Sequence, residues 1–386
     1  MLSHVFQFDV PSHRQILNTI RVHKEISGAD LARLNNLRPS TLVYILRALS
    51  ERGLIEVSRI AARSGIAGKP PTLWQLKADK GYIVGLEIIP NELRATVINF
   101  QCAVVHQEHR LGLDSIGPKK LTASIHDFFV ELLRHLGLKR DQVIGIGAAL
   151  TGLVDREAGI VRFSRKLELH NFPIQRQLTT KLRVPVEVVN DANAGALGIK
   201  WQAEDVLSSR PNVVFLTLNE KTAYFGAGLI LNQTLYEGVN GTAGEICEAL
   251  PSLHEFIARA QTRLGPHHPL TVLRAAKTEI DIEDVIRCAQ EGCALSNDVL
   301  EQYADMIVEE ILRIVQLLAP NVIILGGDIT NARDLICPRI AEQVNRRLKQ
   351  IFQSAIVAPE IEFSRHGIYS VSFGATALIQ RRIFMG

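Results

Sequence analysis

Two segments of this 386-residue chain carry side chains that could bind a small molecule rich in hydroxyl groups. The first, Asn190-Asp191-Ala192-Asn193, follows an apolar run at residues 184–189. A carboxylate at a strand end can remove a proton from a hydroxyl within hydrogen-bond reach, and an asparagine amide can both donate to and accept from hydroxyls. The second segment is residues 241–246, which contain Gly244-Glu245. Taken alone, the first segment could equally be a turn that caps the next helix.

Strand-like and helix-like patterns alternate from Gly81 onward, as in an α/β protein. The first series predicts a β-meander, then a helix and two buried strands, at residues 82–87, 94–100, 103–106, 121–136, 143–148 and 186–189. The second predicts two strands, a long amphipathic helix and a strand before Gly326-Gly327, at residues 213–218, 228–231, 298–318 and 322–325. A last helix is predicted to start at residues 374–377.

The first 78 residues show a different pattern, with three short helices followed by two strands. Residues 27–30 have the sequence of a capping box, and Pro39 suits the first turn of the third helix. Apolar residues repeat at helical spacing in all three helices, and we expect these to face the core: Ile16, Leu17, Ile20, Leu31, Leu34, Leu42, Ile45, Leu46 and Leu49. Strands predicted at residues 54–57 and 72–76 enclose a basic loop. This order is typical of a winged helix-turn-helix.

Charge is distributed unevenly along the chain. Residues 1–80 contain 12 Lys or Arg against 6 Asp or Glu, a net charge of +6, whereas residues 81–386 carry 31 against 34, a net charge of −3. A basic excess on a winged helix favours binding to DNA phosphates. We expect these side chains to contact double-stranded DNA: Arg38, Ser40, Thr41, Tyr44, Arg47, Arg63 and Lys69. A three-helix packing module that never meets DNA is the alternative.

The composition is that of an ordinary globular protein, with 47% hydrophobic and 22% charged residues. Five scattered cysteines without a CxxC pair predict a reducing, cytoplasmic setting and no disulfide. The N-terminus lacks a secretory signal pattern, and no apolar stretch is long enough to span a bilayer. We therefore expect no membrane contact.

Taken together, these segments resemble the ROK family (repressors, open reading frames and sugar kinases) over nearly the whole chain. The resemblance implies a winged helix-turn-helix followed by a two-lobed, actin-like ATPase fold of the α/β class. The implied domains are residues 1–78, residues 79–194 completed by 371–386, and residues 195–370 with a dimerisation surface. Asp191 matches the proton-removing aspartate of the family's kinases, and Asn190 and Glu245 match positions that bind the sugar.

Several departures from the family pattern concern catalysis. The family's first phosphate loop reads acidic-x-Gly-Gly-Thr-Lys, but here residues 87–92 read Glu-Ile-Ile-Pro-Asn-Glu. Proline lacks an amide donor, isoleucine adds bulk, and Glu92 reverses a charge. The glycine-rich second loop is also broken, at residues 221–228. ATP binding and phosphotransfer are not expected, so we predict no catalytic residue and no cofactor.

Metal and sugar positions have changed as well. The family's zinc-binding cysteine cluster is absent after Glu245, and Cys247 with His254 supplies too few ligands, so we predict no metal. Glu248 replaces the family histidine that touches the sugar, and Lys166 stands near a usual asparagine. Lys166 could select a phosphorylated or acidic ligand, or could neutralise Glu248.

We predict a DNA-binding regulator, a repressor of carbohydrate-related genes, with a catalytically inactive body that senses a sugar or sugar phosphate. The expected partners are a DNA operator and further copies of the chain in a homodimer or larger homo-oligomer. Two alternatives stay open: an active sugar kinase with an accessory DNA-binding head, and a regulator whose body responds to a protein partner or to no ligand. Arg38 stands where repressors of the family usually have a serine that caps the third helix. The arginine cannot supply that cap but could contact a DNA phosphate instead.

Overall fold

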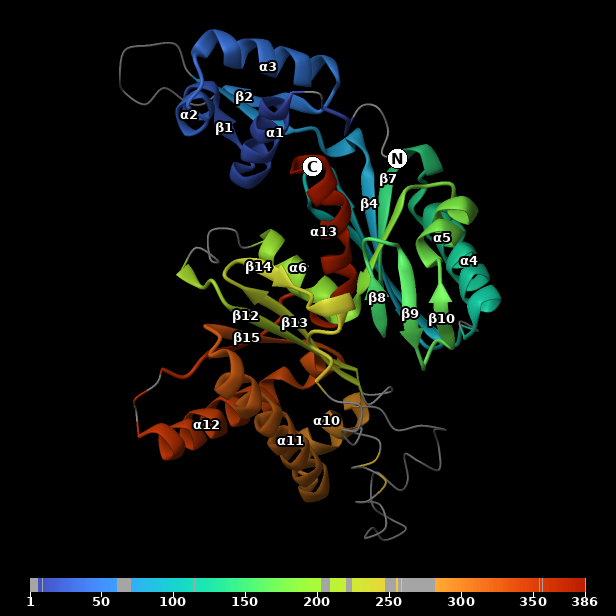
Figure 1. Ribbon diagram of the computed structural model, residues 1–386, viewed down its shortest axis with the longest axis vertical. Helices are drawn as coiled ribbons and strands as arrows, with labels where there is room; N and C mark the ends of the chain where they lie inside the picture. The colour runs from blue at the N-terminus through green and yellow to red at the C-terminus, as the bar shows by residue number, and fades with distance from the viewer. Residues whose placement is uncertain are drawn as a thin grey trace. The chain divides into compact units, whose positions relative to one another are not determined.

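The computed structural model describes residues 6–8, 10–60, 71–113, 116–202, 209–219, 224–246, 282–353 and 357–385, with the single residues 255, 258 and 355. Contacts between Cα atoms divide the chain into two compact units (Figure 1). Unit 1 comprises Met1–Leu150, Arg156–Val189 and Ala375–Gly386, and unit 2 comprises Thr151–Asp155 and Asn190–Gly374. The N-terminal head therefore falls in the same unit as the first α/β lobe. The expected domain boundaries at residues 78 and 194 stay a prediction.

The head is a winged helix. Its elements are α1 (Pro11–His23), β1 (Ile26–Ser27), α2 (Gly28–Leu34), α3 (Pro39–Glu51), β2 (Ile55–Ile60) and β3 (Thr72–Leu76). The three strands form an antiparallel sheet in the order β1-β3-β2. The Ser27 hydroxyl accepts a hydrogen bond from the Asp30 amide at 3.1 Å, as the capping-box sequence predicts. Gly53, with a φ of 65°, follows the end of α3 and turns the chain into β2.

Most expectations for the core of the head are confirmed. All but one of the nine apolar residues predicted to face inward are buried. The exception is Leu34, which is 48% exposed and was wrongly assigned to the core. Helix α2 has only 7 residues and ends at Leu34, so a single inward turn, centred on Leu31, suffices to pack it. The two-residue strand β1 was not predicted, because it is too short to show an alternating pattern.

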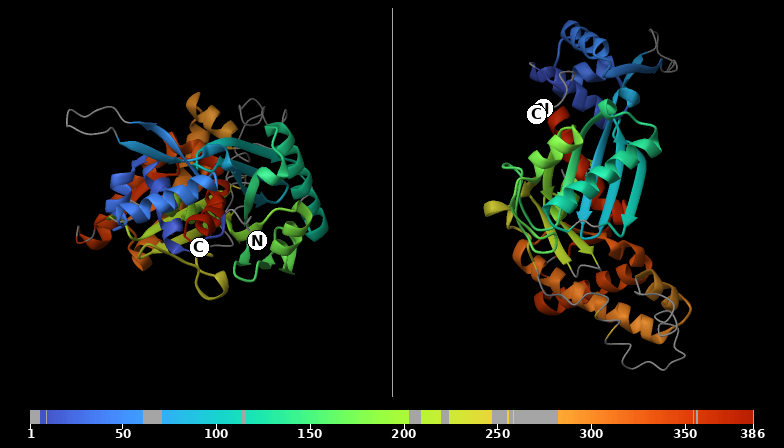
Figure 2. Two further views of the ribbon diagram at one scale, coloured as in Figure 1. Left: turned by 90° about the horizontal axis from the view of Figure 1, so that it is seen from above. Right: turned by 90° about the vertical axis from the view of Figure 1, so that its right-hand side faces the viewer.

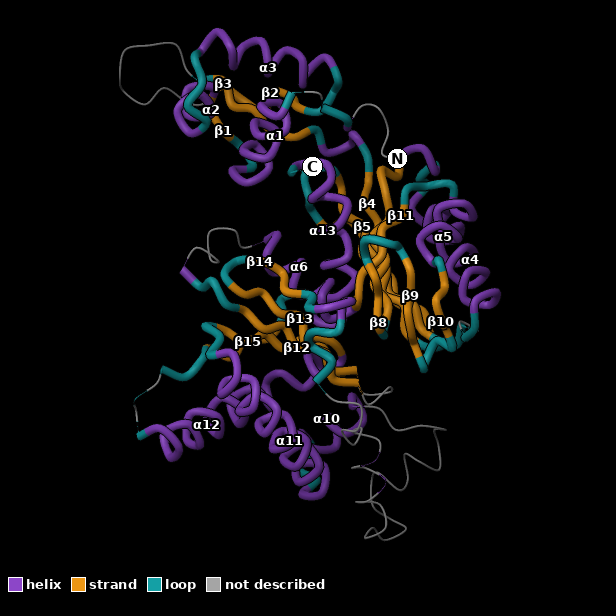
Figure 3. Tube along the Cα trace, viewed as in Figure 1, coloured by secondary structure: helices purple, strands orange, loops and turns teal. Residues whose placement is uncertain are grey.

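The α/β part of unit 1 is built on a five-stranded sheet in the order β11-β7-β4-β5-β6 (Figure 3). The strands are β4 (Tyr82–Ile89), β5 (Glu92–Asn99), β6 (Val104–Leu111), β7 (Val143–Leu150) and β11 (Val186–Asn190). Helices α4 (Pro118–Leu136) and α5 (Ile174–Leu182) lie on one face and α13 (Ser370–Phe384) on the other (Figure 1). Two short strands, β9 (Ile160–Ser164) and β10 (Leu169–Phe172), pair as a hairpin.

Helix α13 lies directly against the backbone of β7. A Cβ atom built on Gly147 would come within 1.8 Å of the Ala375 carbonyl oxygen, and one on Gly145 within 2.9 Å of the Ile379 side chain. At its other end α13 reaches the head through an aromatic cluster. The Phe384 ring lies 5.7 Å from that of Phe100, which also lies 5.5 Å from Phe6.

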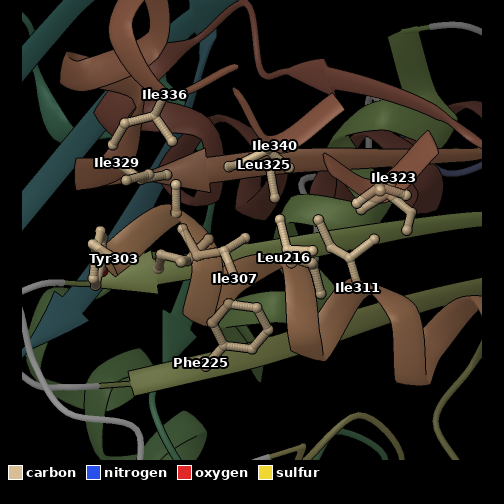
Figure 4. Close-up of a cluster of buried hydrophobic side chains, with 14 of the residues drawn as sticks. Leu216, Phe225, Tyr303, Ile307, Ile311, Ile323, Leu325, Ile329, Ile336 and Ile340 are labelled. Atoms are coloured by element: carbon tan, nitrogen blue, oxygen red, sulfur yellow. The ribbon is translucent and has the colours of Figure 1, made fainter. Parts of the chain in front are cut away.

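Unit 2 contains a second five-stranded sheet in the order β14-β13-β12-β15-β16. Its strands are β12 (Val213–Asn219), β13 (Tyr224–Leu231), β14 (Thr234–Tyr236), β15 (Val322–Gly327) and β16 (Glu360–Phe363), and β8 (Leu153–Asp155) also belongs to this unit. Helix α6 (Asp191–Gln202) covers one face; α10 (Ile282–Gln290), α11 (Ala294–Leu318) and α12 (Arg333–Phe352) cover the other (Figure 1). Alternate residues of β12 face the two sides. Phe215 packs on Gly195 of α6, whereas Leu216 joins the α11–α12 core (Figure 4).

The two long elements predicted for this region are present but start earlier than expected. Helix α11 begins at Ala294 instead of Asp298, and α13 begins at Ser370 instead of Gly374. Polar residues in a first turn weaken the apolar periodicity that marks a helix start, which is why both boundaries were placed late. In the described part of the chain, no helix is long and apolar enough to cross a membrane.

The close packing of α13 on β7 can be tested by adding a side chain at the contact. Gly147→Ala should lower the free energy of unfolding by about 1–3 kcal/mol, because the new methyl group overlaps the Ala375 carbonyl and the helix must shift. Gly28→Ala is the control, since a Cβ at that position meets nothing within 4 Å. Urea or thermal unfolding followed by circular dichroism measures both variants. Equal stabilities would show that α13 does not need the glycine.

Candidate functional site

Helix α3 presents the residues that the sequence predicted to meet DNA. Arg38 is the N-cap, with extended backbone and no side-chain capping bond, and Pro39 occupies the first turn. Arg38, Ser40 and Thr41 are exposed. Leu42, Ile45, Leu46 and Leu49 are buried beneath them. The four residues of α3 that were predicted to face the core are therefore confirmed as buried.

Two side chains on the exposed face of α3 have partners that sequence reasoning missed. Tyr44 is 68% exposed, yet its ring stacks on His13 of α1, with centroids 6.3 Å apart and planes at 29°. Burial, followed by the charge of nearby Arg52, lowers the pKa of His13. Arg47 donates from Nε to Glu51 at 2.8 Å. An ion pair one turn apart shows in the sequence as Arg–x₃–Glu, whereas only the fold brings His13 to Tyr44.

The wing is the loop between β2 and β3, and the structure describes only the strands at its base. Arg63 and Lys69, both predicted DNA contacts, lie outside the described residues. At the base of the wing, Arg59 of β2 pairs with Glu25 at 2.9 Å. Bonds from Ser58 and Arg59 lower the pKa of the Glu25 carboxyl. Glu25 therefore orients Arg59 without removing it from solvent, since the arginine side chain is 67% exposed.

Asn190 in unit 2 serves as the N-cap of α6. Its Oδ1 accepts from the Asn193 amide at 3.1 Å, and its Nδ2 donates to the Gly152 carbonyl at 3.1 Å. The helix-capping alternative for this segment is thus confirmed for Asn190. A cap leaves one N–H and one lone pair of the amide uncommitted by these two bonds, so capping and ligand binding are compatible.

Asp191 and Asn193 flank this cap. Asp191 is half-buried, and its Oδ1 accepts from the Ala192 amide at 2.8 Å. Asn193 is 2% exposed, and in the described part of the chain its Oδ1 has no hydrogen-bond partner. Sequence reasoning did not single out Asn193, although a second asparagine in the first turn was the available signal. The strand end therefore gathers three polar side chains, Asn190, Asp191 and Asn193.

The remaining predicted ligand residues are placed separately. Glu245 is exposed and follows Gly244, whose φ is 89° and whose Cβ would meet the Ala227 carbonyl oxygen at 1.8 Å, so only glycine fits there. Lys166 is half-buried in the turn between β9 and β10, in unit 1. Glu248 lies outside the described residues. The ligand-binding roles of all five predicted residues stay predictions.

The segment that corresponds to the first phosphate loop is a tight hairpin. Ile89 pairs with Glu92, so Pro90 and Asn91 form a two-residue turn, and Asn91 has a φ of 60°. Proline before a residue of positive φ is the order of a type II turn. No glycine is present to let backbone amides approach a ligand, and Ile89 is 5% exposed.

Buried charges next to this hairpin are engaged with one another. Arg94 lies 2.5 Å from Glu92 and 3.8 Å from Glu87, and His109 lies 2.8 Å from Glu92. The side chains of Glu87, Glu92 and Arg94 are at most 4% exposed. Buried charges are tolerated when they are paired in this way. Glu87 and Glu92 are thus paired with Arg94 inside the protein, so the Arg94 guanidinium is not open to a nucleotide.

Glycines that remain in the second loop region serve packing. A Cβ on Gly226 would contact Ala192 at 3.2 Å, and one on Gly228 would meet the Ala192 carbonyl oxygen at 2.2 Å, so both let β13 approach α6 closely. Residues 220–223 of this loop, and Cys247 and His254 of the former zinc segment, lie outside the described residues. Within the residues that the structure covers, no group of three or more His, Cys, Asp or Glu could hold a metal ion.

Comparisons with known proteins agree with this architecture. The ROK family profile matches residues 83–259 and 247–382, together most of the chain. The chain belongs to the ROK family. A winged helix DNA-binding domain profile matches residues 11–64. The xylose repressor of Caldicellulosiruptor bescii is 24% identical over 94% of both chains, and the DNA-binding transcriptional dual regulator NagC of Escherichia coli is 22% identical over 94% of this chain and 90% of its own.

Solved structures show the same fold. A ROK family transcriptional regulator described as a homolog of E. coli MLC protein aligns with a TM-score of 0.73 at 22% identity, over 99% of this ROK protein and 98% of that chain. A ROK family glucokinase from Streptomyces griseus, in complex with glucose and AMPPNP, aligns with a TM-score of 0.66 at 19% identity. The alignment covers 78% of this chain and 100% of that chain. The predicted fold class, a winged helix followed by an actin-like α/β body, is confirmed.

Removing the N-cap of α6 tests its structural role. Asn190→Ala should destabilise the protein by at least about 1 kcal/mol, because it removes the cap and strands the Gly152 carbonyl. Asn190→Asp keeps an acceptor for the Asn193 amide but cannot donate to Gly152, so its loss should be smaller. Melting temperatures of the three proteins rank them. If Asn190→Asp is the less stable variant, repulsion between its carboxylate and the Gly152 carbonyl outweighs the retained cap.

Proposed function

We propose that this ROK protein is a DNA-binding transcriptional regulator, a repressor of carbohydrate-related genes, whose kinase-like body senses a sugar or sugar derivative without phosphorylating it. The observation that carries the proposal is that a winged helix is joined to a body whose hairpin, at the position of the family's first phosphate loop, has buried charges paired with one another. Relatives named as xylose repressor and NagC support the choice of a regulator over an enzyme.

The DNA half of the mechanism follows from the face of α3. Arg38 supplies positive charge, the charge of Arg47 is offset by Glu51, and Ser40, Thr41 and Tyr44 can reach base edges. We infer that the protein acts as a homodimer, so that two heads read a pseudo-palindromic operator. The cytoplasm is the expected location, because the ligands of both halves, DNA and imported sugars, are found there.

The sensing half follows from the strand end of unit 2. Asn190, Asp191 and Glu245 retain the polar chemistry that suits vicinal hydroxyls, whereas the hairpin at Pro90 lacks the amides that suit phosphates. A ligand that binds one conformation of the body better than another shifts the population of that conformation. Release from the operator follows when the favoured conformation holds the two heads at the wrong spacing.

Two other functions are less well supported. An active sugar kinase with an accessory head is structurally plausible, because kinases such as the S. griseus glucokinase share the fold. It would need phosphate contacts from the hairpin at Pro90, which has no glycine. A body that responds to a protein partner or to no ligand would leave Asp191 and Glu245 without a binding role.

Salt dependence tests operator recognition. An operator is first selected from random duplex DNA with the purified full-length protein, and affinity is then measured by fluorescence anisotropy at several salt concentrations. Arg38→Ala should weaken binding to all sequences similarly and reduce the salt slope by about 1, because one phosphate contact is lost. Arg346→Ala, an exposed arginine on α12 of unit 2, is the matched control. Selection of no sequence by the wild-type protein would refute the proposed function.

Effector binding has its own test. Thermal shift against a panel of sugars and sugar phosphates identifies an effector, which should release wild-type protein from the operator. Asp191→Ala and Glu245→Ala should each abolish this release and leave operator affinity without effector near wild type, because a ligand acts only through differential contacts. Glu342→Ala on α12, also an exposed acid of unit 2, is the control. A normal response in both the Asp191→Ala and the Glu245→Ala variant would place the sensor elsewhere.

Phosphotransfer is tested directly with MgATP. The wild-type protein should show neither a thermal shift with MgATP nor ATP-dependent phosphorylation of hexoses or pentoses, because the hairpin at Pro90 offers no amide cradle. A coupled ADP-release assay with the sugar panel measures turnover. Turnover that Asp191→Asn abolishes would establish the kinase alternative.

A further inference from the structure

The exposed face of α3 contains an apolar residue among polar ones. Ser40, Val43, Tyr44 and Arg47 follow one another at helical spacing along a single stripe, opposite the buried residues of this helix. Val43 is 64% exposed in the middle of that stripe. Figure 2 shows α3 on the outer side of the head, away from the five-stranded sheet of unit 1. Val43 therefore contributes nothing to the core, and its side chain is available to a partner.

The neighbours of Val43 define what this stripe can contact. Toward the C-terminal end of α3, the ion pair of Arg47 with Glu51 places a carboxylate next to the guanidinium, which disfavours approach of DNA phosphates there. Toward the N-terminal end lie the exposed side chains of Arg38, Ser40 and Thr41 and the positive end of the helix dipole. The N-terminal half of α3, with Val43 at its inner limit, is thus the part suited to enter the major groove.

Tyr44 is held beside Val43 by a residue of another helix. The His13 ring stacks on that of Tyr44 and so limits the directions that the tyrosine side chain can take. Val43 is β-branched, with one preferred rotamer in a helix. The two adjacent side chains therefore present a preorganised apolar and aromatic surface, which loses little conformational entropy when DNA binds.

We propose that Val43 is a specificity-determining residue that contacts the 5-methyl group of a thymine in each operator half-site, with His13 positioning Tyr44 next to it. The thymine methyl is the one apolar group that a base edge presents in the major groove, and it is the partner that an exposed aliphatic side chain on a recognition helix fits. This inference rests on the proposed DNA-binding function and adds the base that the helix reads.

The test combines a protein variant with a base analogue. Each thymine of the selected operator is replaced in turn by deoxyuridine, which lacks only the methyl group, in both half-sites together. At one position the wild-type protein should lose about fourfold in affinity per half-site, the effect of one buried methyl group. Val43→Ala should bind the unmodified operator more weakly and lose nothing further at that position. Val105→Ala, an exposed valine on β6 of unit 1, should retain the full wild-type response.

A second variant tests the positioning role of His13. His13→Ala should broaden the base preference next to the thymine in a repeated selection while the melting temperature of the protein changes little more than in Val43→Ala. The inference is overturned if every deoxyuridine substitution affects wild-type protein and Val43→Ala equally. That result would leave sequence-specific binding by the wild-type protein intact, and so would not bear on the proposed function. Unchanged operator binding by Val43→Ala would equally overturn it and point to a protein partner for this valine.

Discussion

The contact between α13 and β7 is the constraint on which unit 1 depends. Gly145 and Gly147 carry no side chain, so the last helix of the chain lies on the backbone of a central strand. The far end of the same helix brings Phe384 to Phe100, and the Arg21 guanidinium of the head lies 5.6 Å from the centroid of the Phe384 ring. The helix that closes the sheet is therefore also the one on which the DNA-binding head rests.

The hairpin at Pro90 is held by ion pairs inside the protein. A nucleotide-binding loop keeps amides and a cation open for phosphate, whereas in this chain Arg94 is committed to Glu92 and Glu87 inside the protein. Such buried ion pairs add little net stability, since desolvation offsets most of their attraction. They do make the hairpin independent of a ligand. At the strand end, Asn190 caps α6 and Asp191 accepts from the Ala192 amide.

Periodicity was sufficient for much of the fold. In α3 the burial of Leu42, Ile45, Leu46 and Leu49 follows from their spacing, because a helix of this length has one face toward the core. It failed where an element is too short to show a period: β1 was missed and Leu34 was misplaced. From the sequence, helix capping and ligand binding were both possible roles for Asn190. An asparagine before a helix can cap it, bind a ligand, or do both.

The sequence by itself determined the class of the protein. The features that show it are the winged-helix pattern, the α/β pattern of the body, the Asn190-Asp191 pair and the altered phosphate loop. Each of these is a local pattern, because it depends on residues near one another in the chain. Tertiary structure decided which side chains share a partner. His13 meets Tyr44, His109 meets Glu92, and Asn190 meets Gly152 across sequence separations that no local pattern encodes. The physical reason is that pairing and burial depend on distance in space, which the chain sets only when its sheets and helices pack together.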